Sequence, residues 1–135
     1  MNYFIYLLAL IGIFAIASPY IDRDYEIFLT GYELSNLGGK LNTYTNSTIV
    51  GISDVAKKYN VFKRSDNYSF YKEFKVPSHT ISSCDLTNFD FYHHVDDEID
   101  QLDFVFMATT INKLIPGILQ ICNTDSKEIQ MYETN

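Results

Sequence analysis

The densest group of side chains capable of chemistry is a histidine- and carboxylate-rich segment at residues 93–103. Imidazole nitrogens and carboxylate oxygens are both metal ligands, so this segment is a candidate site for a metal-dependent enzyme or a calcium-binding module. The candidate ligands are His93, His94, Asp96, Asp97, Glu98 and Asp100. Adjacent histidines on a strand point to opposite faces, and the HExxH and EF-hand spacings are both missing. A solvated acidic turn is therefore the favoured interpretation.

Motifs for nucleophilic catalysis and phosphate binding are missing from the sequence. The chain has no GxSxG elbow, and His79 lies in a Pro-Ser-His-Thr segment without a recognisable partner. The Gly38-Gly39 pair lacks the spacing of phosphate-binding loops and predicts a turn. We therefore predict no catalytic residues and no cofactor, and we favour a non-catalytic protein over an enzyme.

A basic and aromatic segment is the better candidate for binding. Residues 57–75 contain six basic side chains and two acidic ones, whereas residues 85–103 contain seven acidic side chains and no basic one. Tyrosine combines a large apolar ring with a hydrogen-bonding tip, which suits a surface that contacts a protein or a glycan. The predicted contact residues are Tyr59, Lys63, Arg64, Tyr68, Tyr71 and Lys72.

The amino-terminal segment predicts export from the cell. Residues 3–17 are nearly all apolar and end at Ala15-Ile16-Ala17, a small-x-small pattern typical of a signal-peptide cleavage site. A helix of this length rises about 22 Å, which is short of the roughly 30 Å hydrocarbon core of a membrane, so a retained anchor is the less favoured alternative. We expect a signal peptide at residues 1–17, a single secreted domain at residues 18–135 and no membrane span after cleavage.

Secretion would place the two cysteines in an oxidising compartment. An even pair there is more often joined than free, so we predict one disulfide between Cys84 and Cys122. Closing this loop would contribute about 4 kcal/mol to stability in the chain-entropy model. Two sequons, at Asn46 and Asn67, are predicted glycosylation sites in a eukaryotic secretory pathway.

The composition excludes one class of partner and favours one class of secondary structure. The net charge is −7, and every charged side chain lies after residue 17, so the mature domain is acidic. A nucleic-acid-binding protein needs a basic footprint, so nucleic acid is excluded as a partner. Tyr and Phe supply the whole 16% aromatic content, and such residues favour strands.

Alternation of apolar and polar residues predicts strands through much of the chain. Residues 68–76 alternate with period two, and residues 102–109 have the pattern of a central strand covered on both faces. Further strands are predicted at residues 25–29, 48–52, 60–64, 89–95, 118–122 and 128–132. About seven to eight short strands favour an all-β fold, a small antiparallel sandwich or barrel stapled by one disulfide.

Two segments favour an α+β alternative, in which an antiparallel sheet carries one or two short helices. Ser53 can cap a short helix over residues 54–59. Apolar residues from Ile111 to Leu119 follow helical spacing, although Pro116 and Gly117 predict a break inside that pattern. Residues 31–47 have weak periodicity and predict a loop or an irregular hairpin.

Taken together, these patterns favour a secreted, non-catalytic domain that binds an extracellular protein or a glycan and needs no cofactor. A carrier of an apolar small molecule is an alternative, in which Phe70, Phe74, Phe104 and Phe106 line the cavity of a small barrel. The metal-dependent enzyme or calcium-binding module is a further alternative. The sequence leaves the oligomeric state open.

Overall fold

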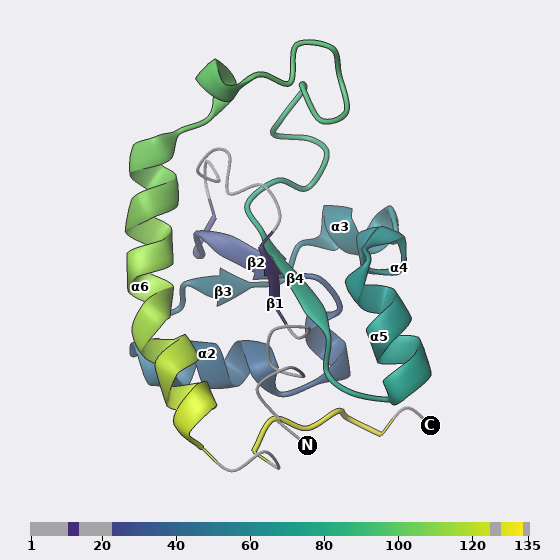
Figure 1. Ribbon diagram of the computed structural model, residues 1–135, viewed down its shortest axis with the longest axis vertical. Helices are drawn as coiled ribbons and strands as arrows, with labels where there is room; N and C mark the ends of the chain where they lie inside the picture. The colour runs from purple at the N-terminus through teal and green to yellow at the C-terminus, as the bar shows by residue number, and fades with distance from the viewer. Residues whose placement is uncertain (1–10, 14–22, 125–127, 134–135) are drawn as a thin grey trace.

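A computed structural model describes residues 11–13, 23–124 and 128–133 of the chain. It is a mixed α/β fold in which helices outnumber strands and surround a small central sheet (Figure 1). The prediction of a β-rich, all-β sandwich or barrel is therefore wrong. The α+β alternative also differs from the structure, because the sheet contains parallel pairs and carries more than two helices.

Four short strands form the sheet: β1 (Ile11–Ile13), β2 (Ile27–Leu29), β3 (Val50–Gly51) and β4 (His79–Ser82), in the order β1-β4-β2-β3. β2 runs parallel to β3 and antiparallel to β4, with Ile27 opposite Val50 and Leu29 opposite Ile81. β1 runs parallel to β4 at the edge of the sheet. β1 lies inside the predicted signal peptide, and the other residues of that peptide fall outside the described part of the chain.

The helices divide into two groups on either side of the sheet. After the 3-10 turn η1 (Tyr32–Leu34), α2 (Leu37–Thr45) connects β2 to β3. Three short helices, α3 (Asp54–Lys58), α4 (Val61–Arg64) and α5 (Asn67–Phe74), follow β3. An irregular segment with the 3-10 turn η2 (Ile99–Gln101) then leads to the long helix α6 (Phe104–Asn123). Figure 1 shows α6 on one side of the sheet and α3, α4 and α5 on the other.

The main apolar core lies where the sheet meets α2 and α6. Its buried members are Ile27, Leu29, Leu37, Leu41, Ile49, Val50, Ile81, Leu114 and Ile121. The buried residues of α6 recur at spacings of three and four, as expected for a helix that presents one face to a core. Gly117 allows α6 to approach α2, because a Cβ at this position would lie only 2.9 Å from Thr45 Cγ2.

Four of the predicted strands lie wholly or mostly in helices, and the strands at residues 68–76 and 102–109 are two of them. Residues 68–76 lie mostly in α5, because Tyr68 and Tyr71 are also spaced to share one helical face. Residues 102–109 lead into α6, where Asp103 Oδ1 accepts a hydrogen bond from the Phe106 amide at 2.8 Å and caps the helix. α6 continues through Pro116 despite the cost of about 3 kcal/mol for an interior proline, because the residues on both sides of it are anchored in the core.

Other expectations have mixed outcomes. The helix after Ser53 is confirmed as α3, where Ser53 Oγ accepts a hydrogen bond from the Ala56 amide at 3.0 Å. The strands expected at residues 25–29 and 48–52 are present as the shorter β2 and β3. The strands expected at 60–64 and 118–122 lie in α4 and α6, residues 89–95 are irregular, and the expected loop at 31–47 contains α2. Gly38 and Gly39 therefore lie in a helix and not in a turn.

The predicted disulfide is also wrong, because both cysteines are free thiols. Cys84 is buried beside Phe89, in a small cluster that Leu102 joins just before α6 begins. Cys122 lies at the other end of α6, about 27 Å farther along the helix axis. A disulfide needs Cα atoms within about 7 Å of each other, so the length of α6 keeps the two cysteines apart.

Candidate functional site

The short helices α3, α4 and α5 carry most of the basic side chains of the predicted binding segment. Asp54 lies in the first turn of α3, and Lys57 and Lys58 lie in its last turn. A negative charge at the amino end and positive charges at the carboxyl end both complement the helix dipole. Lys63 and Arg64 end α4 in the same way. These basic residues therefore lie at the carboxyl ends of α3 and α4, which Figure 1 shows on the side of the sheet away from α6.

Phe62 anchors this helical layer to the sheet. Its ring contacts Tyr68 edge-on at a centroid distance of 5.4 Å and Tyr71 at 5.1 Å. On its other side it stacks on His79 of β4 at 5.8 Å. Tyr68 and Tyr71 are thus half-buried packing residues, whereas Tyr59, the third predicted tyrosine, is 48% exposed.

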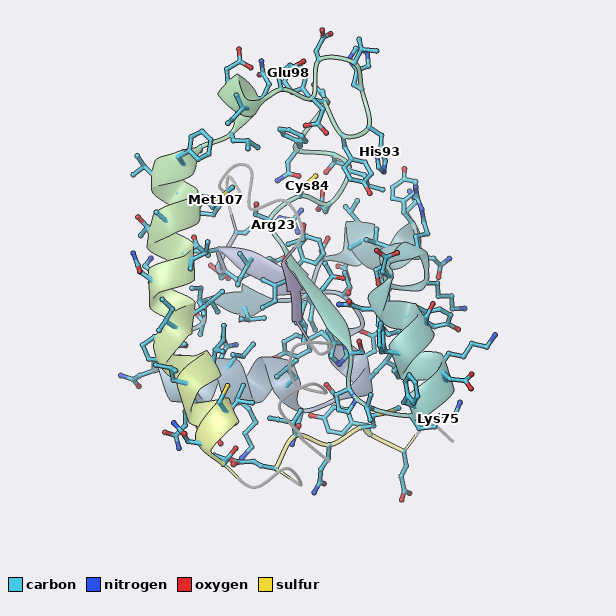
Figure 2. All side chains as sticks on the ribbon, viewed as in Figure 1. Arg23, Lys75, Cys84, His93, Glu98 and Met107 are labelled. Carbon is cyan, nitrogen blue, oxygen red and sulfur yellow. The ribbon has the colours of Figure 1, made fainter. Side chains whose placement is uncertain are left out.

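Five exposed cations on these helices have no carboxylate partner in the described part of the chain. We call Lys58, Lys63, Arg64, Lys72 and Lys75 the cationic surface. Figure 2 shows Lys75 at the far end of α5, where it points away from the sheet. Three of the predicted contact residues, Lys63, Arg64 and Lys72, belong to this surface.

Three basic residues outside these helices form ion pairs with carboxylates. Arg23 lies 3.6 Å from the buried carboxylate of Asp85, and Lys40 lies 2.8 Å from Glu128. Lys113 forms an ion pair with Glu26. These three cations are engaged in holding the fold together, so the free positive charge of the described chain is concentrated on the cationic surface.

Two hollows lie on either side of α4. One has a volume of about 190 Å³ and combines apolar Leu34, Ile52 and Phe62 with Lys57 and Lys63. The other has a volume of about 50 Å³ and is lined by Arg64, Tyr92 and hydroxyl-bearing residues of the sheet. Both are smaller than a typical small-molecule site, and they match the size of single side chains of a partner.

The phenylalanines expected to line a ligand cavity lie on two separate surfaces. Phe70 and Phe74 are 41% and 55% exposed on α5, with ring centroids 6.0 Å apart. Phe104 is 53% exposed and Phe106 is half-buried, both on α6. A larger hollow of about 560 Å³ is lined by Arg23, Asp24, Glu26 and Lys113 among others, which does not suit an apolar ligand.

The histidine- and carboxylate-rich segment forms an exposed loop at one end of the molecule. His94 Nδ1 lies 3.2 Å from Asp96 Oδ2, and His93 has a left-handed backbone with φ of 61°. Figure 2 shows His93 and Glu98 at separate places along this loop. Within the described residues, no group of three or more His, Cys, Asp or Glu side chains is arranged to hold a metal ion.

The predicted glycosylation sites differ in accessibility. Asn46 is exposed at the carboxyl end of α2, where it adopts a left-handed conformation with φ of 49°. Asn67 is half-buried, and its side-chain amide donates hydrogen bonds to the His79 carbonyl and, at 3.4 Å, to Thr80 Oγ1. Of these two predicted glycosylation sites, Asn46 is the one whose side chain is exposed to solvent in the folded chain.

A buried serine–histidine pair was not recognised in the sequence. His79 Nδ1 lies 2.8 Å from the Thr30 carbonyl, which can only accept, so this nitrogen carries the proton. His79 Nε2 therefore accepts a hydrogen bond from the Ser35 hydroxyl at 2.8 Å. Burial lowers the pKa of His79 below its ordinary value of 6.5. Both side chains are at most 1% exposed, so this pair resembles a catalytic one in geometry and lacks the solvent access that a nucleophile needs.

The carboxyl-terminal segment, residues 128–133, covers this region. Ser35 pairs with Met131, the Asn36 amide bonds to the Gln130 carbonyl at 3.1 Å, and the Tyr132 amide bonds to the Leu34 carbonyl at 2.9 Å. The Glu128 carboxylate fixes the start of the segment through hydrogen bonds from Lys40 and Tyr44. These two bonds lower the pKa of Glu128 to about 2.

Helix α6 has an unusual outward face. Four of its large apolar side chains are well exposed: Phe104 at 53%, Val105 at 79%, Ile115 at 43% and Leu119 at 56%. We call these residues, together with exposed Ala108 and Cys122, the outer stripe. By length and composition alone, α6 is also a helix that could cross a membrane, and this is weak evidence because core helices pass the same test.

Two signals in the sequence could have revealed this face. Only one of the twenty residues of α6, Lys113, is charged, and apolar residues recur with helical spacing on more than one side. Pro116 instead predicted a break in the helix.

Comparisons of the chain with protein-family models, with curated proteins and with solved structures find no match.

Proposed function

We propose that this protein is a secreted, non-catalytic binding protein whose cationic surface engages an acidic segment of an extracellular protein. The observation that carries the proposal is the separation of charge. The chain has a net charge of −7, yet the five cations of the cationic surface lack carboxylate partners within the described residues, whereas Arg23, Lys40 and Lys113 are paired. Solvated cations on one face can steer an acidic partner and orient it.

Exposed aromatic side chains on the same helical layer favour a protein over a glycan as the partner. Phe70, Phe74 and Tyr59 are exposed beside the cations, and the hollow next to Lys63 is lined by apolar side chains. Aromatic residues are enriched in the contact surfaces of protein complexes. An acidic segment that also carries aromatic or aliphatic side chains would use both kinds of contact.

Binding to defined polymers tests this proposal. The probes are a glutamate–tyrosine copolymer, polyglutamate without aromatic residues, and heparin as an anionic glycan. The variant combines Lys63→Gln, Arg64→Gln and Lys72→Gln, and the control combines Gln101→Glu, Thr109→Glu and Gln120→Glu, which changes the net charge equally at exposed positions elsewhere. We expect the variant to bind the copolymer about tenfold more weakly and the control to bind like the original chain.

Two outcomes would contradict the proposal. Equal loss of binding in the variant and the control would show that net charge alone matters. Binding to heparin without binding to the copolymer would replace the protein partner with a glycan. Secretion is tested separately by the intact mass of the protein released from expressing cells, which we expect to begin at Ser18, and a released chain that retains residues 1–17 would contradict cleavage.

A further inference from the structure

We infer that residues 34–36, Lys40 and Tyr44 form a binding site for an extended peptide of another protein that carries a glutamate, and that the carboxyl-terminal segment is its internal ligand. The site lies at the end of η1 and along α2, and it shares no residue with the cationic surface (Figure 1). The inference goes beyond the proposed function and does not depend on it. Its basis is how the segment is held, which is through its backbone and one carboxylate, with little burial.

The backbone of the segment pairs with residues 34–36 as an added antiparallel strand. The Asn36 amide donates to the Gln130 carbonyl at 3.1 Å, and the Tyr132 amide donates to the Leu34 carbonyl at 2.9 Å. These two bonds flank an antiparallel bridge. Addition of an extended segment through its backbone is a recurring mode of peptide recognition, and it tolerates many side chains. The same bonds can therefore be made by another extended chain.

The side chain of Asn36 bonds to the segment instead of to its own helix. Asparagine directly before a helix usually accepts a hydrogen bond from an amide of the first turn. Asn36 precedes α2, whose residues are all described, and its side chain makes no such bond. Its Nδ2 donates to the Glu128 carbonyl at 2.8 Å, and its Oδ1 accepts from the Gln130 amide at 2.9 Å. An amide side chain is suited to this task, because it offers a donor and an acceptor to the backbone of a peptide.

One carboxylate gives the site its selectivity. Lys40 Nζ lies 2.8 Å from Glu128 Oε1, and the Tyr44 hydroxyl donates to the same oxygen. Lys40 and Tyr44 are four residues apart on α2, so they share one face of this helix. Hydrogen bonds to a charged group are roughly twice as strong as neutral ones. Because Ile129 packs against the main core, the site also contacts the side chain that follows the glutamate.

The segment is held weakly enough for a competing peptide to displace it. None of the residues 128–133 is buried, and the Tyr132 side chain is 52% exposed. Ile129 packs against the main core but is itself only half-buried. Segments with few buried apolar contacts open at a smaller cost in free energy than the core does. The site can therefore open while the rest of the chain stays folded.

The internal ligand controls the affinity for a competing peptide. A peptide binds only to the fraction of chains whose own segment is undocked, so its apparent affinity falls by that fraction. Weakening the segment should thus tighten the binding of a free peptide. This gain distinguishes a binding site from a purely structural contact, because loss of a structural contact creates no affinity for a peptide.

Fluorescence anisotropy with full chains and a labelled peptide tests the site. The probe has the sequence of residues 128–133, Glu-Ile-Gln-Met-Tyr-Glu. We expect the Glu128→Gln chain to bind it about fivefold more tightly than the original chain does, because its own segment competes less well. The control chain, Glu133→Gln, has the same charge change at an exposed position and should bind like the original chain. Equal affinities of the three chains, or no binding by any of them, would overturn the inference.

Two peptides of equal charge test the recognition of the carboxylate. The Glu128→Gln chain should bind the peptide with Glu128→Gln several-fold more weakly than the peptide with Glu133→Gln. Adding Lys40→Gln to this chain should reduce the difference between the two peptides, because the ammonium that contacts the first glutamate is gone. Equal binding of both peptides to the chain that retains Lys40 would overturn recognition of a glutamate.

The two triple variants of the proposed function separate that proposal from this inference. Added to the Glu128→Gln chain, the combination of Lys63→Gln, Arg64→Gln and Lys72→Gln should bind the peptide as tightly as its charge-matched control, because these residues lie outside the site. Weaker binding than in the control would place the peptide on the cationic surface and overturn the inference. A failure of the copolymer to bind the cationic surface would leave the peptide result unchanged.

Discussion

The hydroxyl of Ser35 donates a hydrogen bond to Nε2 of His79 at 2.8 Å, and neither side chain is reached by solvent. The pair joins the segment before α2 to the strand β4, while the Thr30 carbonyl accepts from the other ring nitrogen of His79. A fully bonded polar network of this kind fixes the register of the elements that it connects, because any shift would leave a buried polar atom without a partner.

Removing the Ser35 hydroxyl should destabilise the fold. Ser35→Ala leaves the buried Nε2 of His79 without a donor, and we expect a loss of about 1–3 kcal/mol in the free energy of unfolding. Urea denaturation followed by circular dichroism measures this change. Ser47→Ala, at an exposed position, is the control and should stay within about 0.5 kcal/mol of the original chain. An equal effect of both variants would show that the Ser35–His79 bond contributes nothing specific.

Protonation of His79 should weaken the fold in mild acid. Its pKa is lowered in the folded state by burial, although the hydrogen bond to Thr30 and the charge of Glu33 oppose part of this shift. The unfolded chain therefore binds a proton near pH 6.5 more readily than the folded chain does, so the stabilisation from the neutral ring is complete above that pH and declines as the pH falls below it. Unfolding free energies at neutral and mildly acidic pH measure the slope.

The His79→Gln variant identifies the source of this pH dependence. Glutamine has an amide donor and acceptor but does not titrate, so we expect a smaller slope below pH 6.5 even if the variant is less stable overall. His93→Gln, on the exposed loop, should keep the slope of the original chain. A slope that His79→Gln leaves unchanged would assign the pH dependence to other groups.

Two helical glycines, Gly39 of α2 and Gly117 of α6, should respond in opposite directions to alanine. At Gly117 a new Cβ would lie 2.9 Å from Thr45 Cγ2, and Thr45 is held by a hydrogen bond from its hydroxyl to the Leu41 carbonyl at 2.8 Å. We expect Gly117→Ala to cost about 1 kcal/mol or more through overpacking. At Gly39 in α2 no atom lies within 4 Å of a new Cβ, so Gly39→Ala should gain up to about 1 kcal/mol from helix propensity. Thermal unfolding distinguishes the two, and stabilisation by both would contradict the close α2–α6 contact.

The carboxyl-terminal segment should be released when Glu128 loses its charge. Its pKa is lowered to about 2 by hydrogen bonds from Lys40 and Tyr44, so these contacts are complete above the ordinary value of 4.5 and are lost as the pH falls from there through about 2. At neutral pH, Glu128→Gln should speed hydrogen exchange of the Tyr132 amide several-fold, because that amide bonds to Leu34 within the same contact. Glu133→Gln, with the same charge change at an exposed position, should leave this exchange rate unchanged. Equal rates in both variants would argue against the Glu128 clamp.

Local chemistry in the sequence predicted some features correctly. The cap at Ser53 and the short helix that follows it depend on a side chain and its own neighbours, so the sequence contains the necessary information. The apolar stretches around β2 and β3 likewise predicted strands at nearly the right positions. The concentration of basic residues at 57–75 is a property of the sequence, and the short helices keep it on one side of the molecule.

Long-range packing decided the remaining features. Residues 68–76 and 102–109 fit a strand by alternation and a helix by spacing, and the contacts of Tyr68 and Tyr71 with Phe62, and of α6 with α2, selected the helix. The cysteines stay unpaired because Cys84 lies near the start of α6 and Cys122 near its end, and no property of the two residues reveals the length of this helix.

The sequence by itself determined the amino-terminal apolar segment, the separation of charge and the helix caps, because each depends on residues that are neighbours along the chain. Only the tertiary structure decided that His79 is buried against Ser35, that the five cations of the cationic surface have no carboxylate partner in the described chain, and that α6 has an apolar face beyond the one it buries. These features depend on which distant segments meet, and that choice follows from the burial of apolar area summed over the whole core.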